Sequence, residues 1–379
     1  MTSGQESSNL GVPPAPYSEI ESLAGVFHPH AIEVQDFSYY ALMIDVRSKA
    51  EYDDDHIPGA VQLTPPHVEA ETAAPRIACD SRPDAKAAGG ASAVEELPEA
   101  LAALVAPVER DQAILLYCGR GGRDSQPLAK ALRWRGWTAD VLPGGWINYR
   151  RWVQAGLEVL PRLVTFRVIA SSLGSEVVRV LSALRELEHQ VLDVEALAGW
   201  SRGALRASSA SQPSQAWFES QLLQAIRGFD PRSPVWIDDL GPQVGTLSMP
   251  GALTDALTIA PMTSLQVTAA ERVRCWWEDQ PQLGAEPSKV VEAVARRSPP
   301  PSTTLLTQLQ RAASKGLSDL LLARLVADCI DPAYTEESAG RCADRHVLPP
   351  LVVESLASRP LAEVVRVWLR AAAPSPSAG

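Results

Sequence analysis

The stretch AILLYCGRGGRDS, residues 113–125, decides the fold. Its apolar start is typical of a buried β-strand, and the three glycines that follow Cys118 predict a tight turn. The pattern SQPLAKALRWRGW, residues 125–137, predicts an amphipathic helix that begins at Asp124 or Ser125. A strand, a turn and a helix in this order indicate a parallel α/β sheet with the turn at its carboxyl edge.

The same alternation extends in both directions along the chain. Upstream, ALMIDV (41–46) and HIPGAVQL (56–63) predict two further strands, and downstream TADVLPGGW (138–146) predicts a strand and a sharp turn. A second α/β unit follows, with strand signals in LVTFRVIA, HQVLDVEAL, SPVWIDDL and SLQVTA and a helix over residues 176–187. After the prolines at 299–301, helical spacing dominates and little β signal is present.

We therefore expect an α/β protein with two parallel-sheet domains and a C-terminal helical segment. The expected division is a disordered N-terminus (1–16), a first domain (17–160), a second domain (161–298) and a helical region with a frayed tail (299–379). Residues 65–90 are rich in Ala, Pro and Gly, which predicts a poorly ordered surface excursion.

Composition narrows the class of protein. No apolar run reaches membrane-spanning length and the N-terminus lacks a leader pattern, so we expect a soluble, cytoplasmic protein. The five cysteines lie far apart without a CxxC pair and the histidines are scattered, which predicts neither a disulfide framework nor a metal cluster. The net charge of −11 disfavours generic nucleic-acid binding. Arginines concentrate between Arg120 and Arg167, as a local positive face or as an ordinary solvated helix surface.

Cys118 is the candidate nucleophile, because it ends a strand just before a glycine-rich turn and a helix N-terminus. Glycines let successive backbone N–H groups turn inward, and the helix aims its positive end at the same point, so a thiolate or a persulfide would be stabilised there. Arg120 and Arg123 add positive charge, whereas Asp124 opposes it unless it caps the helix or pairs with an arginine.

Two alternatives concern the same turn. Cys118 could be a buried strand-end cysteine packed as a small hydrophobe, and the other four cysteines are expected to be structural. A Cys-based phosphatase loop needs an arginine at position 124, where this chain has Asp, so phosphatase chemistry is disfavoured.

Several segments resemble the rhodanese superfamily: LMIDVRSKAEYDDDHIPGAVQL (42–63) and the loop LLYCGRGGRDS (115–125). LPGGWINYRRWV, FRVIASSLGS, HQVLDVEALAGWSRGAL, QPSQAWFESQLL, SPVWIDDL and DPAY then follow in order, and this series is similar to tRNA 2-selenouridine synthase, a rhodanese domain fused to a P-loop domain. The resemblance implies that selenium from selenophosphate replaces the sulfur of wobble 2-thiouridine in tRNA, through an S-geranylated intermediate made from geranyl diphosphate.

The resemblance also assigns site residues. Cys118 matches the essential cysteine, and the active-site loop comprises Gly119, Arg120, Gly121, Gly122, Arg123 and Ser125, with Gly119 where the family has tryptophan and Asp124 where it has arginine. In the second domain the family pattern GGxTGSGKT is replaced by residues 170–178, so that only Gly174 and Ser175 remain of a degenerate phosphate loop. A Walker A loop needs its lysine and hydroxyl, so we expect weak or absent diphosphate binding there. Arg179 could supply charge.

Three functions remain open at this point. The first is a tRNA 2-selenouridine synthase-like transferase, in which Arg150 and Arg151 guide the anticodon backbone and Trp146, Trp152 or Trp200 stacks on a base or packs in the core. The second is a divergent rhodanese-type sulfurtransferase that does not act on tRNA. The third is a binding protein whose catalysis is impaired. The aspartates at 238 and 239 could hold a metal, although structural or capping roles are preferred.

Overall fold

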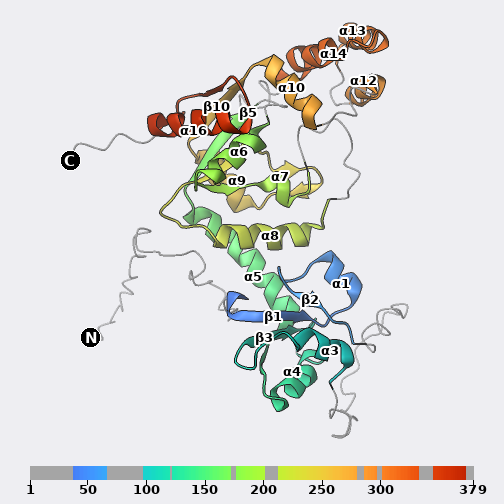
Figure 1. The fold of residues 1–379 in the computed structure, drawn as a ribbon, viewed down its shortest axis with the longest axis vertical. Coiled ribbons are helices and arrows are strands. Elements are labelled where there is room, and N and C mark those ends of the chain that lie inside the picture. The colour runs from blue at the N-terminus through green and yellow to red at the C-terminus, as the bar shows by residue number, and fades with distance from the viewer. Residues whose placement is uncertain are drawn as a thin grey trace, which may run out of the picture.

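Two parallel β-sheets lie in separate parts of the molecule, and a long helix runs between them (Figure 1). The computed structural model describes residues 37–65, 97–119, 122–171, 176–200, 212–279, 286–296, 301–332 and 345–372. The predicted N-terminal tail (1–16), nearly all of the predicted excursion at 65–90 and the last seven residues lie outside these ranges. The expected α/β class with two parallel sheets is confirmed.

The first sheet has the strand order β2-β1-β3-β4, with all pairs parallel. Its strands are β1 (Tyr40–Asp45), β2 (Val61–Gln62), β3 (Ala113–Tyr117) and β4 (Thr138–Val141). The helices α1 (Lys49–Asp54), α3 (Glu99–Val105) and α4 (Ser125–Trp134) connect them. Every residue of the central strand β3 is buried, which explains its uninterrupted apolar sequence.

Alternate residues of these strands belong to two different cores. Leu116 and Ile44 pack with residues of α3 and α4, such as Leu101 and Leu132. Leu115 and Tyr117 face the other way and pack in the core that also contains residues of the long helix α5 (Gly145–Val159). The helix therefore starts at the first sheet and continues as part of the second domain's packing.

The second sheet has the order β11-β10-β5-β7-β6, also parallel throughout. Its strands are β5 (Phe166–Ser171), β6 (Gln190–Leu192), β7 (Val235–Asp238), β10 (Met262–Val267) and β11 (Leu351–Val353). The helices α6 (Val177–Glu186) and α16 (Ser358–Ala372) share the core on one face, whereas α8 (Gln215–Arg227) and α9 (Gly251–Ile259) share the core on the other. The short helix α7 (Val194–Leu197) and the hairpin β8 (Gln243–Val244)–β9 (Leu247–Ser248) complete this domain.

The expected helical region is present, but it does not extend to the end of the chain. The helices α10 (Ala269–Asp279), α12 (Pro287–Ala295), α13 (Thr303–Ser314) and α14 (Ser318–Leu325), with a π-helical turn at Val326–Ile330, share one core across residue 299. After them, β11 joins the edge of the second sheet and α16 packs on α6. The sequence analysis did not anticipate this strand, because three residues, LVV, are too few for a periodic signal.

A cluster of charged groups joins the two domains at Arg150 of α5. One guanidinium nitrogen of Arg150 lies 3.0 Å from the Asp55 carboxylate of the first domain, and it also donates to the Ser220 hydroxyl of α8 at 3.1 Å. The other contacts the Glu219 carboxylate. Asp55 is 2% exposed and also accepts from the Ser220 hydroxyl. The expectation that Arg150 guides an RNA backbone is therefore wrong, since its charge is used between the domains.

Aromatic stacking and a second hydrogen bond extend this junction. His56 lies between Tyr52 and Trp217, with ring centroids 3.9 Å and 4.1 Å away. The Ser214 hydroxyl, which caps α8, donates to the Asp54 carbonyl. The end of α1 in the first domain thus contacts the start of α8 in the second.

We predict that Arg150→Met lowers the free energy of unfolding at pH 8 by about 3 kcal/mol, because removing one partner leaves the buried Asp55 carboxylate without its cation. Urea denaturation followed by circular dichroism measures the change. Arg151→Met, at the exposed neighbouring position, is the matched control and should stay within about 0.5 kcal/mol of the wild type. Equal losses in the two variants would contradict the assignment.

The pH dependence of stability should report Asp55. Burial raises the pKa of the Asp55 carboxyl to about 6, and Arg150 and Ser220 offset this only in part. Between about pH 4 and pH 6 the folded protein keeps the Asp55 proton, whereas the unfolded chain has lost it. The contribution of this proton to the free energy of unfolding is therefore full below about pH 4 and is lost as the pH rises through about 6. The free energy of unfolding of the wild type, compared with that of Asp55→Asn, should therefore decline over this window and then level off. A difference that grows with pH would refute this prediction.

Candidate active site

Cys118 lies directly after β3, and its side chain is 1% exposed. Apolar residues of the first domain's core surround it, among them Ile44, Val46 and Ala129. The Ser125 hydroxyl, itself fully buried, donates to Sγ over 3.4 Å. Ser125 is the first residue of α4, so the sulfur lies at a helix N-terminus as the sequence predicts.

The rest of the predicted active-site loop is described only in part. Arg120 and Gly121 lie outside the described residues, so the inward-facing amides stay a prediction. Gly122 has φ +78°, and a Cβ there would come within 2.9 Å of the Gln126 side chain, so this position favours glycine. Its carbonyl accepts from the Gln126 amide and leads into α4.

Asp124 pairs with an arginine. Its negative charge near the loop was expected to be tolerated if it either capped the helix or paired in this way. Its carboxylate accepts from Arg123 Nε at 3.1 Å and makes no side-chain capping bond to α4. The Arg123 side chain is 66% exposed, so this pair is held on the surface. Gly119 leaves open space around its Cα, where the family has a tryptophan side chain.

Arg47 is the residue that sequence reasoning missed. It is 4% exposed, and its guanidinium binds both carboxylate oxygens of Asp45, with Nη2 at 2.6 Å from Oδ2. Nη2 also donates to the Asp55 carbonyl at 2.6 Å, and the guanidinium carbon lies 3.6 Å from the centre of the Trp146 ring. The Trp146 amide in turn donates to the Cys118 carbonyl at 2.9 Å. The sequence feature that could have identified Arg47 was the Asp-Val-Arg sequence at the end of a strand.

The tryptophans proposed as possible stacking platforms serve packing instead. Trp152 is 5% exposed and carries the Arg227 guanidinium over its ring, and Trp146 packs between Arg47 and the aromatic core. Trp200 packs partly buried against the same core. The alternative of core packing is therefore confirmed for all three.

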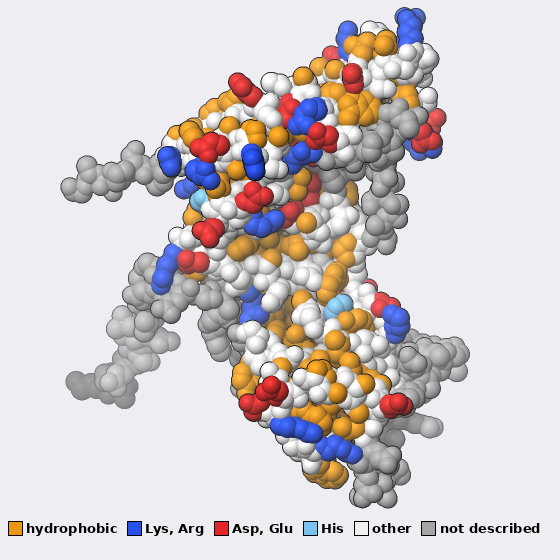
Figure 2. Space-filling view, in the orientation of Figure 1, with side chains coloured by type: hydrophobic (Ala, Val, Ile, Leu, Met, Phe, Trp, Pro, Cys, Tyr) orange, Lys and Arg blue, Asp and Glu red, His pale blue; other side chains and the backbone are white. Residues whose placement is uncertain are grey.

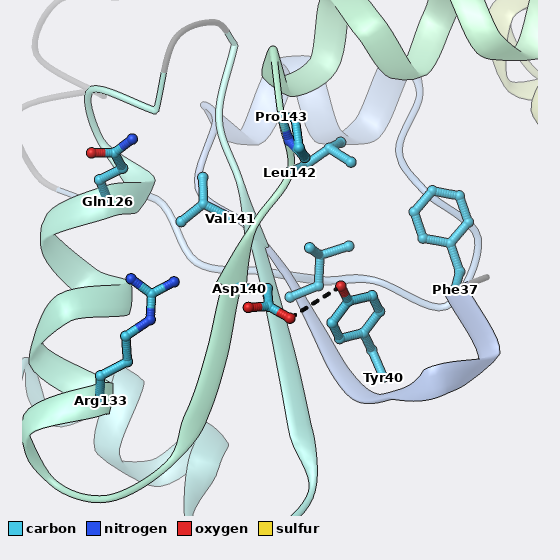
Figure 3. A pocket seen from close by; sticks show the side chains of 9 residues that line it. Phe37, Tyr40, Gln126, Arg133, Asp140, Val141, Leu142 and Pro143 are labelled. Atoms are coloured by element: carbon cyan, nitrogen blue, oxygen red, sulfur yellow. Dashed lines mark hydrogen bonds between the residues drawn. The ribbon is translucent and has the colours of Figure 1, made fainter. Parts of the chain in front are cut away.

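A cavity of about 410 Å³ opens beside β4, the edge strand of the first sheet (Figure 3). Tyr40 donates to the Asp140 carboxylate at 3.3 Å inside it, and burial, followed by Asp140, raises the pKa of Tyr40 to about 12. Gln126 and Arg133 of α4 form its opposite wall. Cys118 does not line this cavity, so the two sites are separate.

One described residue next to the degenerate phosphate loop has a left-handed backbone. Gly174 and Ser175 lie outside the described residues, but Glu176, where the family has glycine, has φ 48° and ψ 47°. This left-handed conformation costs a non-glycine residue roughly 1–2 kcal/mol. Val177 and Val178 replace the lysine and threonine, and Arg179 pairs with Glu278 at 3.3 Å.

Two further groups in the second domain, the Asp238–Asp239 pair and the Cys275 thiol, are candidate reactive groups. Asp239 faces the Arg345 guanidinium at 3.5 Å and both are buried, which fits the structural role preferred for the pair with Asp238. Burial raises the pKa of the Cys275 thiol to about 11, so it stays protonated at neutral pH. Among the described residues, no group of three histidine, cysteine or acidic side chains could hold a metal ion.

Two protein families match this chain, one over each domain. The rhodanese-like domain family matches residues 32–151, and the tRNA 2-selenouridine synthase AAA domain matches residues 164–346. The chain belongs to the tRNA 2-selenouridine synthase family. The second match ends before β11 and α16, which are the elements that the sequence analysis had not placed in this domain.

Curated relatives with the name tRNA 2-selenouridine synthase are similar over part of their length. The Nitrosomonas europaea protein is 26% identical over 51% of this chain and 50% of its own. The proteins of Alcanivorax borkumensis and Hydrogenovibrio crunogenus are 28% and 27% identical, over 43% and 55% of this chain and 45% and 54% of theirs. The chain thus spans about half the length of these relatives. In the described residues, every helix is too short or too polar to cross a bilayer.

We predict that Ser125→Ala slows alkylation of Cys118 by iodoacetamide at pH 7 by about tenfold, because a hydrogen bond to a charged acceptor contributes about 1.5–3 kcal/mol. Peptide mapping by mass spectrometry separates Cys118 from the other cysteines. Ser182→Ala, a serine substitution in α6 of the second domain, is the control and should leave the rate unchanged. A rate at Cys118 that does not respond to Ser125→Ala would exclude the hydroxyl from a role in thiolate formation.

Proposed function

We propose that this chain is a sulfur- and selenium-group transferase of tRNA that replaces the sulfur of wobble 2-thiouridine with selenium. In this proposal selenophosphate and geranyl diphosphate are co-substrates, the S-geranylated nucleoside is the intermediate, and the protein acts in the cytoplasm. Cys118 is the nucleophile that carries the chalcogen atom. The observation that carries the proposal is the Ser125 hydroxyl on Cys118 Sγ, at the first turn of α4, in a chain that joins both family domains.

The roles of the remaining loop residues follow from charge and position. Gly119, Arg120, Gly121 and Gly122 would direct amides and positive charge at the terminal atom of a persulfide or perselenide on Cys118. Arg123 neutralises Asp124, so this carboxylate does not repel that anion. Because Cys118 is 1% exposed, the reaction requires a local opening that gives the sulfur access to a donor and an acceptor.

Two other functions have specific observations in their favour. The loss of the Walker lysine and threonine at Val177 and Val178 favours a rhodanese-type sulfurtransferase that does not act on tRNA. In that reaction the Cys118 thiolate would attack the outer sulfur of thiosulfate, forming an S–S bond while sulfite leaves with the electron pair. The 1% exposure of Cys118 favours a binding protein with impaired catalysis.

We predict that a strain without the gene lacks 2-selenouridine in its tRNA, that the wild-type gene restores it and that Cys118→Ala does not, because the chalcogen carrier is lost. Mass spectrometry of nucleosides from tRNA hydrolysates measures the change. Cys329→Ser, at a half-buried cysteine of the helical region, is the matched control and should restore the nucleoside.

The same strains separate the three functions. Sulfur transfer from thiosulfate by the purified protein, abolished by Cys118→Ala but without any 2-selenouridine in the cell, would establish the second function. Absence of both activities in the wild type would establish the third.

A further inference from the structure

The last turn of α4 presents an exposed tryptophan. Trp134 is 64% exposed, although large aromatic side chains are rarely left in water on a folded domain. The Lys130 ammonium, one helical turn earlier, lies 4.9 Å from the centre of its ring. This contact holds the indole and a positive charge side by side on the surface.

Two arginines add charge beside this tryptophan. Arg133 donates through Nε to the Ala139 carbonyl at 2.6 Å, and its guanidinium lies between Gln126 and Asp140 in Figure 3. Arg110 contacts the Arg135 carbonyl and stacks over the Trp137 ring, with its guanidinium carbon 3.3 Å from the ring centre. We call Arg110, Lys130, Arg133 and Trp134 the α4 basic patch. Figure 2 shows Lys and Arg side chains gathered at this lower end of the first domain.

The partners of these cations differ from those of many other arginines. Arg150 pairs with Asp55, Arg272 with Asp331 and Arg366 with Glu363. Arg167, like the patch, contacts an aromatic ring. No ion pair to a described carboxylate is recorded for Arg110, Lys130 or Arg133, whose contacts are carbonyl oxygens and aromatic faces. Positive charge therefore gathers here on a chain with a net charge of −11, although Asp140 lines the same cavity as Arg133, and Glu109 and Asp111 flank Arg110 in the sequence.

We propose that the α4 basic patch is the surface that grips the tRNA, with Lys130 and Arg133 on backbone phosphates and Trp134 stacked on an unpaired base. Clustered cations next to an exposed aromatic ring are suited to bind single-stranded and loop RNA. The cations bind backbone phosphates, and an unpaired base stacks on the aromatic ring. This inference rests on the proposed function and gives it an RNA-binding surface in place of Arg150.

The position of the patch on α4 fits this role. Ser125, which binds the Cys118 sulfur, is the first residue of the helix and Trp134 is the last. At a rise of about 1.5 Å per residue the two ends are roughly 14 Å apart. The last turn of α4 lies at the end of the helix away from the sulfur, so a stem-loop bound there would extend along α4 to bring its target base to Cys118.

The experiment measures binding of an anticodon stem-loop RNA containing 2-thiouridine to the full chain by fluorescence anisotropy at several salt concentrations. For the double variant Lys130→Ala with Arg133→Gln, we expect affinity at 100 mM salt to fall at least tenfold. The slope of log affinity against log salt should become shallower by about 2, because two phosphate contacts are lost. Trp134→Ala should weaken binding about tenfold with the salt slope unchanged, since stacking releases no counterions.

The matched control is Lys49→Ala, also on an exposed helix of the first domain, where the lysine already pairs with Asp53 at 2.8 Å. It should leave the affinity and the slope unchanged. Thermal melting confirms that each variant is folded, and Trp134→Ala removes only an exposed side chain, so it tests the patch even if the double variant does not fold.

The possible outcomes are distinguishable. Wild-type binding that neither the double variant nor Trp134→Ala weakens would overturn the patch and leave the proposed function standing. Wild-type protein that transfers sulfur from thiosulfate but binds no stem-loop would overturn the tRNA function and the patch together. If the patch variants lose no more RNA affinity than Lys49→Ala does, the change in net charge alone explains the loss, and the inference is also overturned.

Discussion

The buried guanidinium of Arg47 is the group on which the arrangement of this protein depends. A cation removed from water is stable only when acceptors surround it, and Arg47 meets this demand with the Asp45 carboxylate, the Asp55 carbonyl and the Trp146 ring. Trp146 holds the carbonyl of Cys118, and Asp55 binds Arg150, which reaches the second domain. One continuous set of polar contacts therefore links the base of the reactive turn to the junction between the domains.

Short sequence patterns predicted the strands, helices and turns that depend on neighbouring residues. The apolar run at 113–117 forms β3, Gly122 has a left-handed backbone, and α4 begins at Ser125. The role of Arg150 could not be predicted in this way, since Asp55 lies 95 residues before it and Ser220 lies 70 residues after it. Periodicity identifies buried faces but does not specify which distant residues meet across them.

The described residues at the degenerate phosphate loop differ in chemistry from those of a Walker A loop. Glu176 remains in the left-handed region that glycine favours, although its side chain would repel a diphosphate. At the position of the Walker lysine, Val177 is buried and contributes to the core between the sheet, α6 and α16. The side chain at this position therefore contributes to packing of the second domain.

The helical segment between the paired strands β10 and β11 has a consequence for synthesis of the protein. β10 ends at Val267 and its neighbour β11 begins at Leu351, with the whole unit from α10 to α14 between them. The edge of β10 and the apolar side of α6 therefore stay uncovered on the ribosome until β11 and α16 have emerged. Exposed strand edges attract other chains. The second sheet is therefore complete only after residues 351–372 have been made and have packed against β10 and α6.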